Sequence, residues 1–363
     1  MIEISLAQSA TIEPEKTHAV LEHAFPRPLN ACYWEPKDRY IFVGSEDFGI
    51  SRFHIESKEI VAMIGPHDSW VRAIGATPDG QVTFSGGYDG RLVWWPTAAQ
   101  KSEPMRVVDA HQGWIRALSV SSDGRRVATC GNDLAVKMWD VESGELIQTY
   151  DGHQWHVYNV SFSPSGEWLV SCDLRGFVKV WPTNGRVTDD ASPPVATDQP
   201  ATADAVKLVS RDLPQVESLY KYDPTFRADI GGARCMAFSK DGSRLAVGGV
   251  TNVTNAFAGI GNFAVALVDF ADGKVMVQLG SKEKVNGTAW GIEQHNQGFW
   301  IGLGGGSGGG WLYFWRDDIA EEFFKLKLKS DGRGMAISPD ESRIAVAHGD
   351  RNLRIYALYT APA

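Results

Sequence analysis

The segment Ala110–His153 decides the fold, and it reads AHQGWIRALSVSSDGRRVATCGNDLAVKMWDVESGELIQTYDGH. It contains four short runs rich in apolar and β-branched residues, which are WIRALSV, RRVATC, LAVKMWDV and ELIQTY. The turns SSDG, GND and ESG separate these runs, and this pattern is typical of short β-strands. A single four-stranded sheet of this composition is apolar on both faces, so it needs neighbouring sheets to cover it.

The same four-strand unit recurs along the whole chain. Each copy can be aligned on the residue that ends its third strand, and these residues follow one another at intervals of 42, 44, 42, 87, 47 and 41. The seven anchors are Phe53, Trp95, Trp139, Trp181, Val268, Trp315 and Tyr356. A period of about 40–45 residues with four strands per unit indicates a β-propeller.

Three further signals recur with the anchors. The first two strands of a unit are joined by TPDG (77–80), SSDG (121–124), SPSG (163–166), SKDG (239–242) or SPDE (338–341). An Asp stands six residues before four anchors, as Asp47, Asp89, Asp133 and Asp350, and one unit carries an intact Trp139-Asp140 pair. With these motifs the chain resembles the WD-repeat β-propeller family over nearly its whole length. The resemblance implies an all-β, seven-bladed propeller of four-stranded antiparallel blades.

The repeat predicts one domain over 18–360. Its blades are expected at about 28–66, 67–110, 111–152, 153–225, 226–280, 281–328 and 329–360. The long interval in blade 4 is interpreted as an insertion, 187–214, rich in Pro, Asp, Ala and Thr, followed by an outer strand at 218–222. Blade 7 is one strand short, and an open edge strand invites unwanted pairing. We therefore expect HAVLEHAF (18–25) to close the ring.

The composition excludes several classes of function. A formal net charge of −9 argues against a general nucleic-acid binder, whose affinity comes largely from Lys and Arg. No apolar run reaches the roughly 20 residues of a membrane span, and the N-terminal segment has no secretory pattern. We predict a cytoplasmic protein, a monomer or a subunit of a hetero-complex, with no cofactor and no metal. The four cysteines are expected to be unpaired.

Two sets of polar residues recur at one offset in successive blades. They are His67, Ser85, Asp89 and Trp95, then His111, Thr129, Asp133 and Trp139. A Ser or Thr with His and Asp could form a nucleophilic triad. The family resemblance instead implies a buried hydrogen-bonded tetrad that holds the blade rigid. Blade 4 keeps His153, Ser171 and Trp181 but has Arg175 at the Asp position, so we expect it to be less rigid or differently satisfied.

The first residue of each inner strand is expected at one rim of the central channel. Counting back from the first turn places equivalent residues at Asn30, Arg72, Arg116, Tyr158, Arg234, Asn286 and Arg333. Trp70, Trp114 and His156 stand two residues before three of them. The long loop 249–263 and the turn Gly304–Gly310 are expected on the same face; GGSGG in that turn matches a nucleophile elbow but joins two strands, so we interpret it as a flexible turn.

Arg and Trp are enriched in binding hot spots, and Arg binds carboxylate and phosphate with two hydrogen bonds. The rim is thus a candidate site for an acidic or phosphorylated protein or peptide, and the chain a non-catalytic scaffold. In an alternative interpretation, rim acids such as Asp68 neutralise the arginines, which then only anchor the ring. A sensor for a small anion or for a sulfated or phosphorylated ligand is a second candidate function, and a propeller enzyme is a third.

Overall fold

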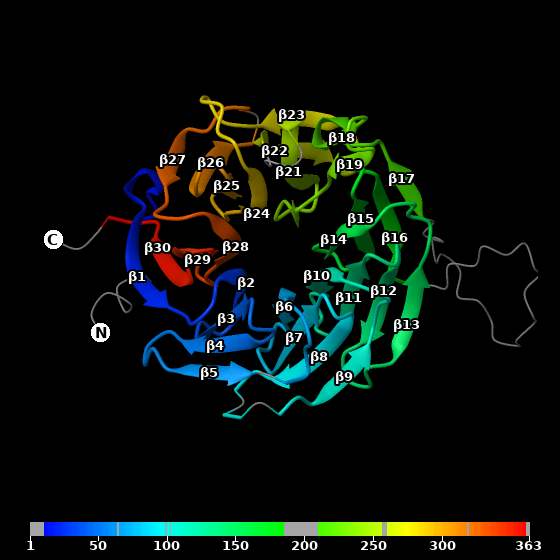
Figure 1. Ribbon diagram of the computed structural model, residues 1–363, viewed down its shortest axis with the longest axis vertical. Coiled ribbons are helices and arrows are strands. Elements are labelled where there is room, and N and C mark those ends of the chain that lie inside the picture. Colours follow the sequence, from blue (N-terminus) through cyan, green and yellow to red (C-terminus); the bar gives the residue numbers. More distant parts are fainter. Residues whose placement is uncertain are drawn as a thin grey trace, which may run out of the picture.

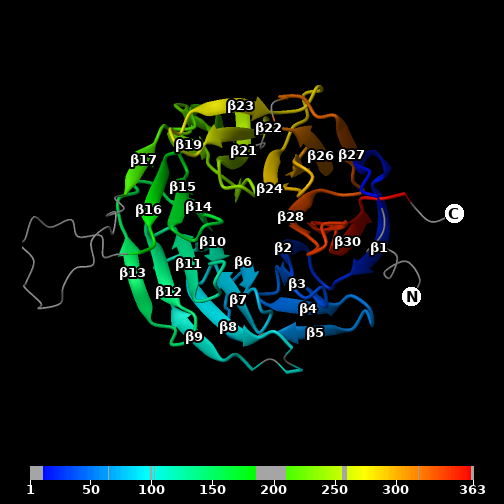
Figure 2. The same cartoon turned by 180° about the vertical axis from the view of Figure 1, so that it is seen from behind.

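The computed structural model describes residues 11–63, 65–98, 100–101, 103–184, 210–255, 260–317 and 319–360. Seven four-stranded antiparallel sheets stand around a central axis like the blades of a propeller (Figure 1). Figure 2 shows the same ring from the opposite face. The predicted fold class is confirmed. The described helices are the short turns η2 (Pro14–Lys16) and η3 (Glu217–Leu219).

The strands of each blade run from the axis outward in chain order, except in blade 7. Blade 1 contains β2 (Leu29–Trp34), β3 (Tyr40–Ser45), β4 (Ile50–His54) and β5 (Ile60–Met63). Blade 2 contains β6 (Val71–Ala76), β7 (Val82–Gly87), β8 (Arg91–Pro96) and β9 (Arg106–Asp109). Blade 3 contains β10 (Ile115–Val120), β11 (Arg126–Gly131), β12 (Val136–Asp140) and β13 (Leu146–Tyr150). Blade 4 contains β14 (Val157–Phe162), β15 (Trp168–Asp173), β16 (Val178–Pro182) and β17 (Arg211–Leu213). Blade 5 contains β20 (Cys235–Phe238), β21 (Arg244–Asn255), β22 (Ile260–Asp269) and β23 (Val275–Leu279). Blade 6 contains β24 (Thr288–Gln294), β25 (Phe299–Gly305), β26 (Trp311–Arg316) and β27 (Phe324–Lys327). Blade 7 contains β28 (Gly332–Ile337), β29 (Arg343–His348), β30 (Asn352–Ala357) and β1 (His18–Ala24).

The hydrophobic core is divided among the gaps between blades. Each of seven buried clusters takes its side chains mainly from two adjacent blades, and the cluster around Phe84, Trp94 and Trp139, for example, joins blades 2 and 3. The second strands are buried along nearly their whole length because neighbouring blades cover both of their faces. The outer strand β13 begins with two exposed residues. All four cysteines are free thiols.

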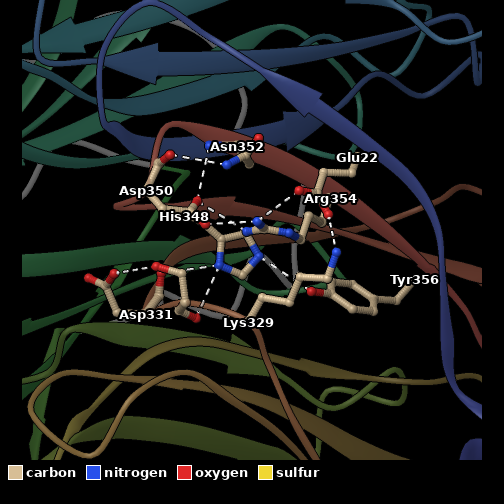
Figure 3. A network of polar contacts seen from close by, with 9 residues as sticks. Glu22, Lys329, Asp331, His348, Asp350, Asn352, Arg354 and Tyr356 are labelled. Carbon is tan, nitrogen blue, oxygen red and sulfur yellow. Dashed lines mark hydrogen bonds and ion pairs between the residues drawn. The ribbon is translucent and has the colours of Figure 1, made fainter.

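The ring closes through β1, as predicted, because β1 pairs with β30 along the outer edge of blade 7. Charged side chains reinforce this pairing (Figure 3). Glu22 of β1 lies 3.2 Å from Arg354 of β30 and 2.6 Å from Lys329, and Arg354 also pairs with Asp350 at 2.7 Å. The Arg354 side chain is nearly buried, so these carboxylates supply the partners that a buried charge requires.

Blade 4 differs from the expectation in its outer strand. β17 (Arg211–Leu213) pairs with β16, whereas β18 (Tyr220–Asp223) forms a separate two-stranded sheet with β19 (Ala228–Gly231). The assignment of 218–222 to the blade edge was therefore wrong, and the strand at 211–213 falls within the expected insertion. A three-residue strand carries too little alternation to be detected. Residues 187–209 of that expected insertion lie outside the described residues.

Three buried hydrogen-bonded tetrads lie inside blades 2, 3 and 4. In blade 3, His111 Nδ1 is 2.8 Å from Asp133, its Nε2 is 2.7 Å from Thr129 Oγ1, and Trp139 Nε1 donates to the same oxygen at 2.9 Å. His67, Asp89, Ser85 and Trp95 repeat this arrangement in blade 2. Burial lowers the pKa of His111 although the nearby Asp133 acts in the opposite direction, and the lowered pKa favours the neutral ring.

Blade 4 completes its tetrad with Asp173, a residue that the sequence analysis missed. His153 Nδ1 lies 2.9 Å from Asp173 Oδ2 and its Nε2 lies 2.8 Å from Ser171 Oγ, to which Trp181 Nε1 donates at 2.9 Å. Asp173 stands two residues before the position that Asp89 and Asp133 occupy in their blades. In blade 4 the hydrogen bond to the tetrad histidine is thus made by an Asp at a different position.

The first prediction concerns this substitute. Asp173→Ala should lower the free energy of unfolding by about 1–3 kcal/mol, because it leaves the buried His153 Nδ1 without a partner. Arg175→Ala, at the position that is Asp in blades 2 and 3, should cost less than about 1 kcal/mol, because Arg175 is partly exposed. Urea unfolding of both variants measures the difference. An equal loss in both would contradict the assignment.

The second prediction concerns His348, the last residue of β29, which is fully buried in the blade that the closing strand completes (Figure 3). Burial, followed by the charge of Arg354, lowers its pKa to about 4. An unfolded His titrates near 6.5, so the unfolded chain takes up a proton first as the pH falls. The stability that neutral His348 contributes is complete above about pH 6.5 and is lost toward pH 4, by about 2 kcal/mol at pH 5. The stability difference between the natural chain and His348→Gln should therefore shrink between pH 7.5 and pH 5, and a constant difference would refute the prediction.

Candidate functional site at the channel mouth

The rim residues are the bulged residues of the inner strands. In six blades the pairing of the first two strands skips one residue, and the skipped residues are Asn30, Arg72, Arg116, Tyr158, Trp290 and Arg333. In blade 5, Arg234 directly precedes β20 and its N–H donates to Gly248 O at 2.8 Å. A bulge leaves a residue outside the regular pairing and redirects its side chain. All seven side chains line one cavity of about 530 Å³ at the mouth of the channel.

The structure therefore brings together the four predicted arginines, but it corrects blade 6. The equivalent residue there is Trp290, four residues after Asn286, which instead forms an isolated bridge with Asn262. The alignment was wrong because this blade lacks a clear turn motif from which to count. An aromatic side chain thus occupies the position that the sequence analysis gave to an amide.

The four arginines differ in how they are paired. Arg333 is neutralised within the protein, since it lies 2.9 Å from Glu46 and 3.1 Å from Asp331. Arg72, Arg116 and Arg234 have no ion pair with any carboxylate in the part of the chain that the structure describes. The proposed alternative partner, Asp68, pairs with Arg91 at 2.7 Å. Internal neutralisation therefore applies to Arg333 and not to the other three.

Aromatic rings hold these three guanidinium groups. The guanidinium carbons of Arg116 and Arg234 lie 4.5 and 4.3 Å from the centre of the Tyr158 ring. That of Arg72 lies 4.4 Å from the Trp290 ring. Stacking on a ring face orients a guanidinium without neutralising its charge, and it leaves the N–H groups in the plane available.

Few of these N–H groups are occupied. Arg72 Nη1 donates to Asn30 O and Arg116 Nε donates to Asn132 Oδ1, both at 2.8 Å. Burial lowers the pKa of Arg72, Tyr88 acts in the opposite direction, and the like charges of Arg234, Arg116 and Arg333 lower the pKa further. The cavity is thus a cationic site whose guanidinium donors have few acceptors among the described residues.

A stack of aromatic side chains lies on one side of the mouth. The rings of Tyr88 and Trp114 are 4.2 Å apart and parallel to within 1°, and Trp70 lies 6.2 Å from Tyr88. Trp70 and Trp114 are 43% and 42% exposed, which is high for such large side chains. Trp70 and Tyr88 line the cavity; Trp114 and His156 are not among its lining residues. The sequence analysis missed Tyr88, although it directly precedes the repeated Asp89.

Glycine backbone forms the opposite part of the wall. The turn between β25 and β26 follows the predicted connection in blade 6, and Gly305, Gly306 and Ser307 line the cavity. A Cβ atom at Gly305 would lie 2.1 Å from the carbonyl oxygen of Gly332, and Gly306 has a φ of +144°. The close approach of this turn to blade 7 therefore requires glycine.

Two additions belong to blades 4 and 5. Arg175 pairs with Asp229 of β19 at 3.0 Å and lies over the Trp155 ring at 4.1 Å, so the residue that replaced the tetrad Asp fastens the β18–β19 hairpin. In the expected loop 249–263, β21 and β22 continue to pair as far as Thr251 and Asn262, and after an irregularity they pair again at Asn255 and Ile260. Residues 256–259 lie outside the described residues.

The described residues offer no arrangement for metal chemistry, since no group of three or more His, Cys, Asp or Glu side chains among them could hold an ion. No helix in the described ranges is long and apolar enough to cross a membrane. The polar chemistry of His67, His111 and His153 is enclosed in the blades, away from the cavity. Arginine donors and aromatic faces are thus what the mouth presents to a ligand.

Comparisons with known proteins agree with this architecture. The family "WD domain, G-beta repeat" matches residues 58–96, 102–140 and 144–182, and each match includes the four residues of one tetrad. The ribosome biogenesis protein WDR12 homolog of Chlamydomonas reinhardtii is 35% identical over 32% of this chain and 30% of its own length. An uncharacterized WD repeat-containing protein of Schizosaccharomyces pombe is 24% identical over 49% of this chain and 52% of its own length.

The guanine nucleotide-binding protein subunit beta-5b of Danio rerio is 30% identical over 30% of this chain and 29% of its own length. The matched part thus spans between about a third and a half of these relatives. Three repeats of the chain match the WD-repeat family, and the described part of the chain forms a seven-bladed β-propeller.

Proposed function

We propose that this protein is a non-catalytic interaction scaffold whose channel mouth binds an acidic or phosphorylated segment of a partner protein. The observation that carries the proposal is the set of three ring-stacked arginines, Arg72, Arg116 and Arg234, which share one cavity and have no described carboxylate partner. Like charges held together without a counter-ion raise the free energy of the empty site, and a bound anion offsets that cost.

Several features support a protein partner. The exposed Trp70 and Trp114 beside the arginines are the residue types most enriched at the centres of protein interfaces. One relative is named as a subunit of a guanine nucleotide-binding protein, which is a name for a part of an assembly. The proposal includes a cytoplasmic protein that acts alone or as one subunit of a hetero-complex.

The third prediction tests this face. The double variant Arg116→Glu with Arg234→Glu should abolish partner capture from a lysate, because it replaces two free cations of the cavity with anions. The matched control is Arg91→Glu with Arg125→Glu, which makes the same change of charge outside the cavity. Quantitative mass spectrometry compares the captured proteins, and thermal melting checks that both variants fold. Unchanged capture by the cavity variant would falsify the proposed contact face.

A small-anion sensor is a second candidate function, and one observation favours it. The six bulged side chains, Arg234 and the glycine turn line a volume of about 530 Å³, which is of the size that small ligands occupy. Thermal-shift measurements with phosphate, sulfate and short polyanions separate the two functions. A large stabilisation by a free anion, together with no protein captured through the mouth, would favour the sensor.

A further inference from the structure

We infer that the channel mouth selects a phosphomonoester over a carboxylate, and that it prefers this group next to an aromatic side chain. This inference rests on the proposed function and adds the chemical class of the bound group and of its neighbour. Three observations carry it: the uneven distribution of charge around the mouth, the free donors of three guanidinium groups, and the position of the exposed aromatic stack.

The charge of the cavity lies on one side. Its lining contains four arginines and two carboxylates, and both carboxylates, Glu46 and Asp331, are bound to Arg333. The positive charge that remains is carried by Arg72, Arg116 and Arg234 of blades 2, 3 and 5. The bulged residue of the blade between the last two is Tyr158, whose ring contacts both of their guanidinium groups. A ligand anion is therefore attracted to the side formed by blades 2 to 5.

The donors on that side match a phosphate better than a carboxylate. One guanidinium satisfies both oxygens of a carboxylate, which carries a single charge. A phosphomonoester carries a charge of about −1.5 to −2 at neutral pH and presents three acceptor oxygens. The Arg234 guanidinium has no hydrogen-bond acceptor among the described residues, and the guanidinium groups of Arg72 and Arg116 each donate one hydrogen bond to a described residue. Three cations with mostly free donors thus suit a dianion with three acceptor oxygens.

The aromatic stack adjoins the same side. Arg116 lies 4.6 Å from the Trp114 ring as well as 4.5 Å from the Tyr158 ring, so one guanidinium joins the anion site to the stack of Trp70, Tyr88 and Trp114. The large exposed fractions of Trp70 and Trp114 leave apolar surface for a ligand to cover. An aromatic side chain next to the phosphate covers this apolar surface best, because offset stacking of two rings adds to the burial of apolar area.

A phosphorylated peptide fits these features better than a nucleic acid does. Each phosphodiester of a nucleic acid carries one charge, and binding along a strand requires a groove with many cations. Here the free cations are confined to one cavity, and the chain as a whole has a formal net charge of −9. A peptide with one phosphate group brings a single dianion to the mouth, whereas a nucleic acid strand would bring many further negative charges close to this acidic protein.

The fourth prediction is tested with the full chain and an array of soluble peptides. The central residue is phosphoserine, phosphothreonine, glutamate or serine, and the neighbours on each side are varied between Trp, Tyr, Leu and Ala. Calorimetry then measures the affinities of the strongest binders. We expect phosphorylated peptides with an aromatic neighbour to bind at least about tenfold more tightly than their glutamate counterparts, since hydrogen bonds to a more highly charged acceptor are stronger.

Single substitutions test separately the preference for phosphate and the preference for an aromatic neighbour. Arg116→Gln and Arg234→Gln should each weaken the phosphorylated peptides by about tenfold or more, while Arg91→Gln and Arg125→Gln, outside the cavity, should leave the affinity unchanged. Trp70→Ala should remove the preference for an aromatic neighbour and keep the preference for phosphate. Phe48→Ala serves as its control, because Phe48 is 45% exposed and is not among the lining residues.

The outcomes distinguish this inference from the proposed function. Equal affinity for phosphorylated and glutamate peptides, lost in Arg116→Gln, would overturn the inference and retain the acidic-segment scaffold. Free phosphate binding as tightly as the best peptide would overturn the role of the neighbour, and tighter binding of a single-stranded oligonucleotide would overturn the choice of partner. If no peptide binds and the Arg116→Glu, Arg234→Glu variant still captures partners, both proposals fail.

Discussion

Burial of both faces of every blade is the constraint on which the rest of the structure depends. No blade can cover its own apolar side chains, and each of the seven buried clusters is shared mainly between two neighbours. In an open row of such sheets, the first and the last sheet would each leave one apolar face uncovered, and closing the row into a ring covers both. The chain closes by placing β1 beside β30 and by fastening Glu22 to Arg354 and Lys329. The closed ring in turn brings the inner strands of distant repeats to one axis.

The candidate site follows from an irregularity that the ring repeats. Register is otherwise regular along the inner strands, and in six blades a single skipped residue near the strand start redirects one side chain into the mouth, while in blade 5 Arg234 directly precedes the strand. Because the equivalent position recurs in every blade, seven stretches that are far apart in the sequence contribute to a single cavity. The protein varies the chemistry of this position from blade to blade, with four arginines, two aromatic residues and one amide, and leaves the frame intact.

The division between rigid frame and binding surface is visible in particular residues. His111, Thr129 and Asp133 have the chemistry of a catalytic triad, yet their hydrogen-bonding capacity is used inside a blade. Blade 4 moves the carboxylate to Asp173, and Arg175 at the usual position reaches outward to the β18–β19 hairpin. The recurrence of the tetrad residues was readable from their spacing. The role of Asp173 was not, because a shift of two residues along a turn leaves no trace in a periodic pattern.

The sequence by itself determined the propeller, its seven blades, its closing strand and the positions of four arginines, because these follow from the period of turns and apolar runs along one chain. Only the tertiary structure decided which arginines remain free. Glu46 of blade 1 neutralises Arg333 of blade 7, two residues that meet because the ring closes. The same holds for two aromatic residues. A bulge in the inner strand decides where Trp290 points, and Tyr88 stacks on Trp114, which belongs to the next blade. Pairing between blades depends on where side chains project in space, and no spacing along the chain records that.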